Sequence, residues 1–146
     1  MSRISILIAL AVAACAPTLI ANQSFLVSEE LKLAPSGYAS LKSTGESFDL
    51  GPIKSQEPKT DRIQILKAHG SYVVVGDGFR KAWILWPGGK DEMHYRPLKL
   101  DPGAQGFSQP ALEPSGNCAL LKWQKGVSPA QAYVNADGDV NEKNCP

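Results

Sequence analysis

Histidine, cysteine and uncompensated charge are all scarce in this sequence. Its 146 residues include two histidines and three cysteines, and 15 lysines and arginines balance 14 aspartates and glutamates to a formal net charge of +1. Because no run of basic residues is present either, the chain lacks the positive field that phosphate backbones attract, and we expect no nucleic-acid partner. Two histidines also leave few ligands for zinc, so we expect no metal and no other cofactor.

Catalytic motifs are missing as well. The sequence contains no G-x-S-x-G nucleophile elbow and no pair of acidic residues in a hydrolase motif. His69 precedes Gly70, which indicates a turn, and His94 is expected at a half-buried position of a strand. We therefore assign no catalytic residue and expect a protein that is not an enzyme.

The first 21 residues are interpreted as an export signal. Arg3 is followed by a small and apolar run over residues 4–16 (ISILIALAVAACA). A helix that spans a bilayer needs about 20 apolar residues, whereas the apolar part of a secretory signal needs only about 7–15. We expect residues 22–146 to form a single exported domain.

The end of this signal resembles the lipobox of bacterial lipoproteins. The residues Val12-Ala13-Ala14-Cys15 place small side chains before a cysteine. The resemblance implies that Cys15 is lipidated and becomes the mature N-terminus, which gives an outer-membrane lipoprotein facing the periplasm or the cell surface. The alternative is an ordinary cut after Ala21, which would leave a soluble periplasmic or secreted protein.

Two cysteines remain in the body after either cut. In an oxidising compartment Cys118 and Cys145 are expected to form a disulfide, with two buried thiols as the alternative. Closing a loop of that size stabilises a folded domain by about 3–4 kcal/mol in the chain-entropy model.

The body is predicted to be all-β. Thirteen glycines and 11 prolines interrupt it too often for long helices, and its apolar residues alternate with polar ones or form β-branched runs. We expect a small antiparallel barrel or two-layer sandwich of about eight short strands with one disulfide. A four-stranded antiparallel meander is predicted over residues 62–65, 71–75, 79–86 and 93–100.

The segments around the meander are less regular. Residues 26–33 can be read as a strand or as one or two helical turns, because Ser28 is followed by two glutamates. Residues 101–117 are rich in glycine and proline and are predicted to be a long irregular loop. The remaining strands are expected at residues 25–33, 38–42, 46–50, 118–124, 131–134 and 139–141.

Oxygen-bearing side chains alternate near the C-terminus, a pattern typical of calcium loops. They are Asn135, Asp137, Asp139, Asn141 and Glu142. The glycine and the final glutamate of an EF-hand loop are not at the required positions. The pattern instead predicts a hairpin turn with Gly138 at positive φ.

Aromatic side chains gather in the meander. Strand alternation places Phe79 and Trp83 on one face and Trp86 on the other, so one of the two tryptophans should lie at the rim of the core or outside it. Packing is the commoner use of such residues, but Trp83, Trp86 and Tyr95 form the candidate binding surface, for a sugar or for a protein partner.

The C-terminal residues Trp123-Gln124-Lys125-Gly126, Ala130, Tyr133 and Asn144-Cys145 are similar to the tail of the membrane-bound c-type lysozyme inhibitors. That resemblance implies a lipid-anchored β-barrel. For an inhibitor of a secreted hydrolase, the irregular loop at residues 101–117 would be a natural insertion element. The S-G-x-x-Y motif of the family is not found at its usual place, so no inhibitory residue is transferred.

From the sequence we expect a non-catalytic binding or structural module of the cell envelope. It would be held to the membrane by a lipid anchor, with an envelope or secreted protein as its partner. The alternatives are an inhibitor of a secreted hydrolase such as lysozyme, and a sugar-binding domain or enzyme.

Overall fold

The computed structural model describes residues 28–146, apart from residues 44, 58, 60, 69 and 91. Most of the described chain lies in two antiparallel sheets. The first has the order β1-β4-β5-β6-β7, and its strands are β1 (Glu29–Leu31), β4 (Ile63–Ala68), β5 (Ser71–Gly76), β6 (Trp83–Pro87) and β7 (Met93–Pro97). The second has the order β11-β10-β9-β8, and its strands are β8 (Ser108–Ser115), β9 (Cys118–Lys125), β10 (Ser128–Val134) and β11 (Val140–Asn141).

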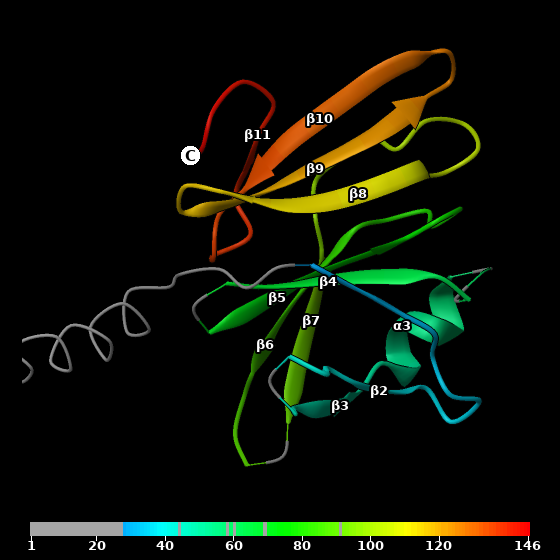
Figure 1. Ribbon diagram of the computed structural model, residues 1–146, viewed down its shortest axis with the longest axis vertical. Coiled ribbons are helices and arrows are strands. Elements are labelled where there is room, and N and C mark those ends of the chain that lie inside the picture. The colour runs from blue at the N-terminus through cyan, green and yellow to red at the C-terminus, as the bar shows by residue number, and fades with distance from the viewer. Residues whose placement is uncertain (1–27, 44, 58, 60, 69, 91) are drawn as a thin grey trace, which may run out of the picture.

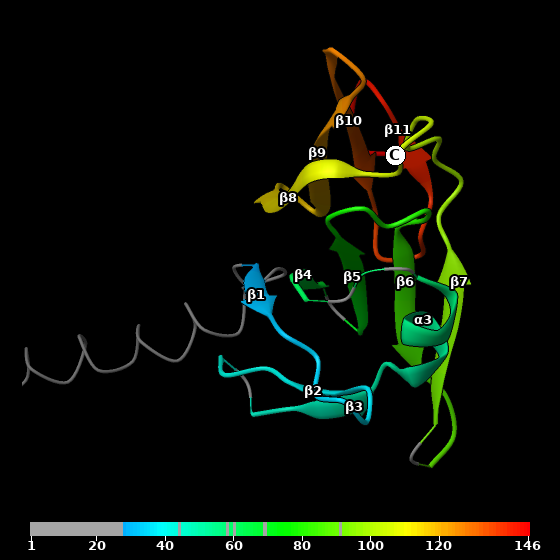
Figure 2. The ribbon, with the colours of Figure 1, turned by 90° about the vertical axis from the view of Figure 1, so that its right-hand side faces the viewer.

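A third, smaller layer completes the fold. It consists of the hairpin β2 (Tyr38–Ser40) and β3 (Ser47–Asp49), followed by helix α3 (Gly51–Gln56). Figures 1 and 2 show the second sheet above the first, with the hairpin and α3 on the other side of the first sheet. The two-layer arrangement of sheets is thus confirmed and extended, whereas the barrel alternative is wrong because neither sheet closes.

The predicted meander is confirmed as β4 to β7, although the strand expected from residue 79 begins only at Trp83 and the strand expected to reach residue 100 ends at Pro97. Strand β5, at the centre of the first sheet, packs against other layers on both of its faces, because all six of its residues are buried. In the register, Val73 pairs with Ile84 and Val74 pairs with Trp83, so successive residues of β5 enter different layers. A β-branched run without polar positions is the sequence that burial on both faces requires.

In the N-terminal segment, Glu29–Leu31 form strand β1, and the helical alternative is wrong for residues 28–33. The two glutamates that resemble a helix start make tertiary contacts instead. The Glu29 carboxylate accepts hydrogen bonds from the backbone N–H groups of Lys42 (2.9 Å) and Ser43 (2.6 Å). A side-chain hydrogen bond from Ser43, together with these backbone bonds, lowers the pKa of Glu29. Glu30 forms an ion pair with Arg62 at 3.3 Å. Residues 25–27 of the predicted strand lie outside the described residues.

The prediction of a long loop over residues 101–117 is wrong, because β8 occupies residues 108–115. Its prolines are tolerated because β8 is an edge strand, and Pro110 lies within an irregularity of the register between Ser108 and Ala111. At this irregularity, the side-chain amide of Gln64 from β4 binds the backbone of β8 in place of strand-to-strand hydrogen bonds. Its Nε2 donates to the Pro110 carbonyl and its Oε1 accepts from the Leu112 N–H, both at 2.8 Å.

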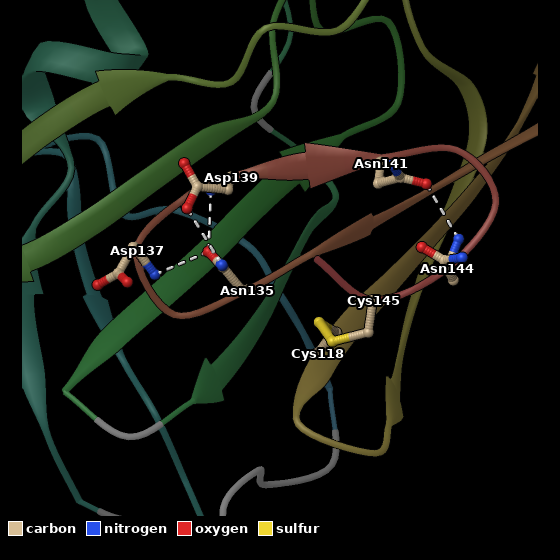
Figure 3. Close-up of a disulfide and its surroundings, with 7 residues drawn as sticks. All are labelled: Cys118, Asn135, Asp137, Asp139, Asn141, Asn144 and Cys145. Carbon is tan, nitrogen blue, oxygen red and sulfur yellow. Dashed lines mark hydrogen bonds between the residues drawn. A yellow bond between two sulfur atoms is a disulfide. The ribbon is translucent and has the colours of Figure 1, made fainter.

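The predicted disulfide joins Cys118 to Cys145, with a Cα–Cα distance of 5.9 Å across 27 residues (Figure 3). Cys118 begins β9 and is fully buried, and Cys145 follows β11 at the end of the chain. The bond therefore attaches the C-terminal segment to the second sheet. Among the described residues, no helix is both long and apolar enough to cross a membrane.

A buried carboxylate connects α3 to the first sheet. Glu57, directly after α3, is 7% exposed. It accepts hydrogen bonds from the N–H groups of Arg80 (2.7 Å) and Lys81 (3.4 Å) and from the indole Nε1 of Trp83 (3.2 Å). Because three donors converge on one carboxylate, the loop before β6 is held against the helix.

We predict that Glu57→Ala lowers the free energy of unfolding by about 2–4 kcal/mol, because buried donors lose their acceptor. The matched control is Glu113→Ala. Glu113 pairs with Lys122 at 3.0 Å, and both side chains are about half exposed, so its loss should cost less than about 1 kcal/mol. Urea denaturation of the oxidised protein measures both free energies of unfolding. Equal decreases in the two variants would show that Glu57 does not hold the loop before β6 against the helix.

Candidate binding groove

The three tryptophans have very different exposures. Trp86 is 37% exposed, whereas Trp83 is 3% and Trp123 is 6% exposed. Trp86 thus lies at the rim, as the alternation of β6 predicts. Trp83 belongs to the core and contributes no surface, and Tyr95 points to the opposite face of the sheet from Trp86, since it pairs with Leu85. The three residues of the predicted binding surface are therefore not brought together.

Trp86 instead lines a groove of about 450 Å³ between the two sheets. Strands β5, β6 and β7 supply its floor, and the turn between β10 and β11 forms one wall. Its lining residues are Gly70, Ser71, Ile84, Trp86, Arg96, Ala136 and Asp137.

The indole of Trp86 is supported by the imidazole of His94. These residues are cross-strand partners in the β6–β7 ladder, and their rings stack with centroids 5.6 Å apart. Gly88 in the adjoining turn makes room for this pair, because a Cβ there would overlap the His94 ring. The strand position predicted for His94 is confirmed, although its side chain is exposed. His69 lies outside the described residues.

Arg96 places a guanidinium in the groove and joins it to the opposite wall. Its Nη2 donates to the Asp137 carbonyl at 2.6 Å, and the Ser71 hydroxyl donates to the Ala136 carbonyl at 2.9 Å. Gly138 has φ +85°, as predicted for the turn, and a Cβ there would overlap Arg96 and lie 3.1 Å from the Ile84 side chain. The turn thus fits against the sheet only with glycine at this position.

The oxygen-bearing residues near the C-terminus are used to close turns. The Asn135 side-chain oxygen accepts hydrogen bonds from the N–H groups of Asp137 (3.0 Å) and Asp139 (2.9 Å), and that of Asn141 accepts from the Asn144 N–H (Figure 3). The Asn141 side-chain oxygen also accepts from the Lys143 N–H at 2.8 Å. Within the described residues, no three histidine, cysteine or acidic side chains are grouped to hold a metal.

The groove combines groups that bind ligands: a partly exposed indole, a guanidinium, and the polar backbone of a turn. Sequence reasoning found Trp86 and missed Arg96. Strand pairing is the signal that points to Arg96. Trp86 pairs with His94 and Ile84 pairs with Arg96, so those four side chains share one face of the sheet. No protein-family model matches this chain, and no curated protein or solved structure matches it significantly.

We predict that Gly138→Ala destabilises the protein by at least about 2 kcal/mol, since it adds steric overlap with Arg96 to the strain of positive φ. Gly126→Ala is the matched control. Gly126 has φ +66°, and a Cβ there would meet nothing within 4 Å, so only the strain of about 1 kcal/mol applies. Chemical denaturation measures the free energy of unfolding of both variants. Equal decreases would show that a Cβ at position 138 does not clash with Arg96.

Proposed function

We propose that this chain is an exported cell-envelope domain, anchored by lipid at Cys15, that acts by binding a partner without catalysis. The observation that carries this proposal is the Cys118–Cys145 disulfide pair. Disulfides persist in oxidising compartments, which agrees with the export signal read from residues 1–21. The lipobox resemblance at residues 12–15 supports the anchor.

The groove beside Trp86 is the proposed contact surface. It offers one aromatic face with a few fixed polar groups around it, which is the usual composition of a recognition site. Its hydrogen bonds between Arg96, Ser71 and the turn preorganise the walls before a partner arrives.

A saccharide is the second candidate, favoured by the exposure of Trp86 beside Arg96. Sugar rings present apolar faces that stack on indole and hydroxyls that bond to charged groups. Inhibition of a secreted hydrolase is supported less, because the expected insertion loop at residues 101–117 is largely strand β8.

Intact mass spectrometry of the protein from its native host tests the anchor and the disulfide together. We predict a chain that starts at Cys15 with an added diacylglyceryl mass, and a shift of two hydrogens on reduction. In a Cys15→Ala variant the lipid mass should disappear and the protein should leave the membrane fraction. A lipid-free chain starting at Asn22 would overturn the anchor, and a missing reduction shift would remove the disulfide.

Tryptophan fluorescence tests the saccharide candidate. Because Trp86 is the most exposed of the three tryptophans, we predict that N-acetylglucosamine oligosaccharides at millimolar concentration change its emission. The variant Trp86→Ala should weaken binding about tenfold, which corresponds to the loss of one aromatic stacking contact. Trp123→Phe is the control, since Trp123 does not line this groove. An unchanged spectrum at millimolar ligand would remove the saccharide candidate.

A further inference from the structure

A second groove lies on the opposite face of β7 from Trp86. His94 and Arg96 point toward the first groove, whereas Met93 and Tyr95 alternate with them and point away. The second groove has a volume of about 680 Å³. It runs between the hairpin β2–β3 and the lower part of the β6–β7 hairpin, which lie near one another in Figures 1 and 2.

The second groove contains a group of aromatic and apolar side chains. Tyr38 is 57% exposed, and Tyr95 and Met93 are half-buried beside it. Two exposed prolines, Pro52 and Pro87, complete the apolar lining. Tyrosine and proline lose little conformational freedom when a ligand binds, so contacts with them are gained at low entropic cost.

The charge of the second groove has one sign. Asp49 and Glu92 line it, and none of the described residues that line it is a lysine or an arginine. Asp49 is the cross-strand partner of Tyr38, so a carboxylate adjoins the most exposed ring. Burial, followed by the negative charge of Asp49 and the neighbouring Tyr38, raises the pKa of Tyr95. Tyr95 therefore stays protonated, and its hydroxyl donates to the Asp49 carbonyl.

We propose that the second groove binds an extended, proline-containing peptide segment that carries lysine or arginine. Prolines of such a segment pack on aromatic side chains in the extended polyproline conformation. The basic side chain then lies between the carboxylates of Asp49 and Glu92, within reach of the tyrosine rings. The chain's own residues 16–27 contain no lysine or arginine, so charge complementarity points to a segment of another protein.

This site is separate from the groove beside Trp86 and does not depend on its function. The two grooves lie on opposite faces of the first sheet, and Tyr38 and Glu92 line only the second of them. The loss of one binding activity can therefore be measured while the other is retained.

Fluorescence anisotropy of a labelled decapeptide of prolines with two arginines tests the proposal on the full mature, oxidised protein. The same peptide with glutamates in place of arginines is the ligand control. We expect the basic peptide alone to bind, and Glu92→Lys and Tyr38→Ala each to weaken binding at least about threefold. Both residues are exposed, and an unchanged melting temperature shows that the variants fold.

The variant Glu142→Lys makes the same change in net charge at an exposed residue directly after β11 of the second sheet, so it separates a specific site from general attraction. We expect its affinity to remain within about twofold of the parent protein. The proposal would be overturned if the acidic and basic peptides bound with equal affinity. It would also be overturned if Glu142→Lys and Glu92→Lys lowered the affinity for the basic peptide equally.

Discussion

The rest of the structure depends on the burial of β5 on both of its faces. All six of its residues are inaccessible, and a strand of this kind is stable only when the sheet around it is covered on each side. The second sheet covers one side, and the β2–β3 hairpin with α3 covers the other (Figure 1). The two grooves lie where these covering layers meet the first sheet, since each groove is lined by residues of both.

The buried layers could be predicted from the sequence where side-chain periodicity was strong. The meander was recognisable because its strands alternate or are continuously apolar and are separated by glycine turns. Strand β8 was missed because Pro110 and Pro114 are typical of loops, and only the tertiary position of β8 at a sheet edge makes them acceptable. Helix α3 was not predicted either, since six residues are too few for a periodic pattern.

The candidate groove was predictable only in part. Alternation along β6 indicated that Trp83 and Trp86 have different surroundings, but it could not indicate which of them is buried. In the structure Trp83 is the buried one, and its indole N–H donates to the carboxylate of Glu57, a residue 26 positions away. The contact of Gly138 with Arg96 likewise joins segments that are distant in the sequence, and no local pattern predicts such a pair.

The balance of charge bears on how either groove would select a partner. If the export signal is removed, Arg3 is lost with it, and the remaining 14 basic residues equal the 14 acidic ones. A neutral domain exerts little long-range steering, so discrimination depends on charges at contact distance. Arg96 and Asp137 line the first groove, whereas Asp49 and Glu92 line the second, so only the second groove carries charge of a single sign. An acidic ligand is therefore disfavoured in the second groove, whereas the first groove presents a charge of each sign to a ligand.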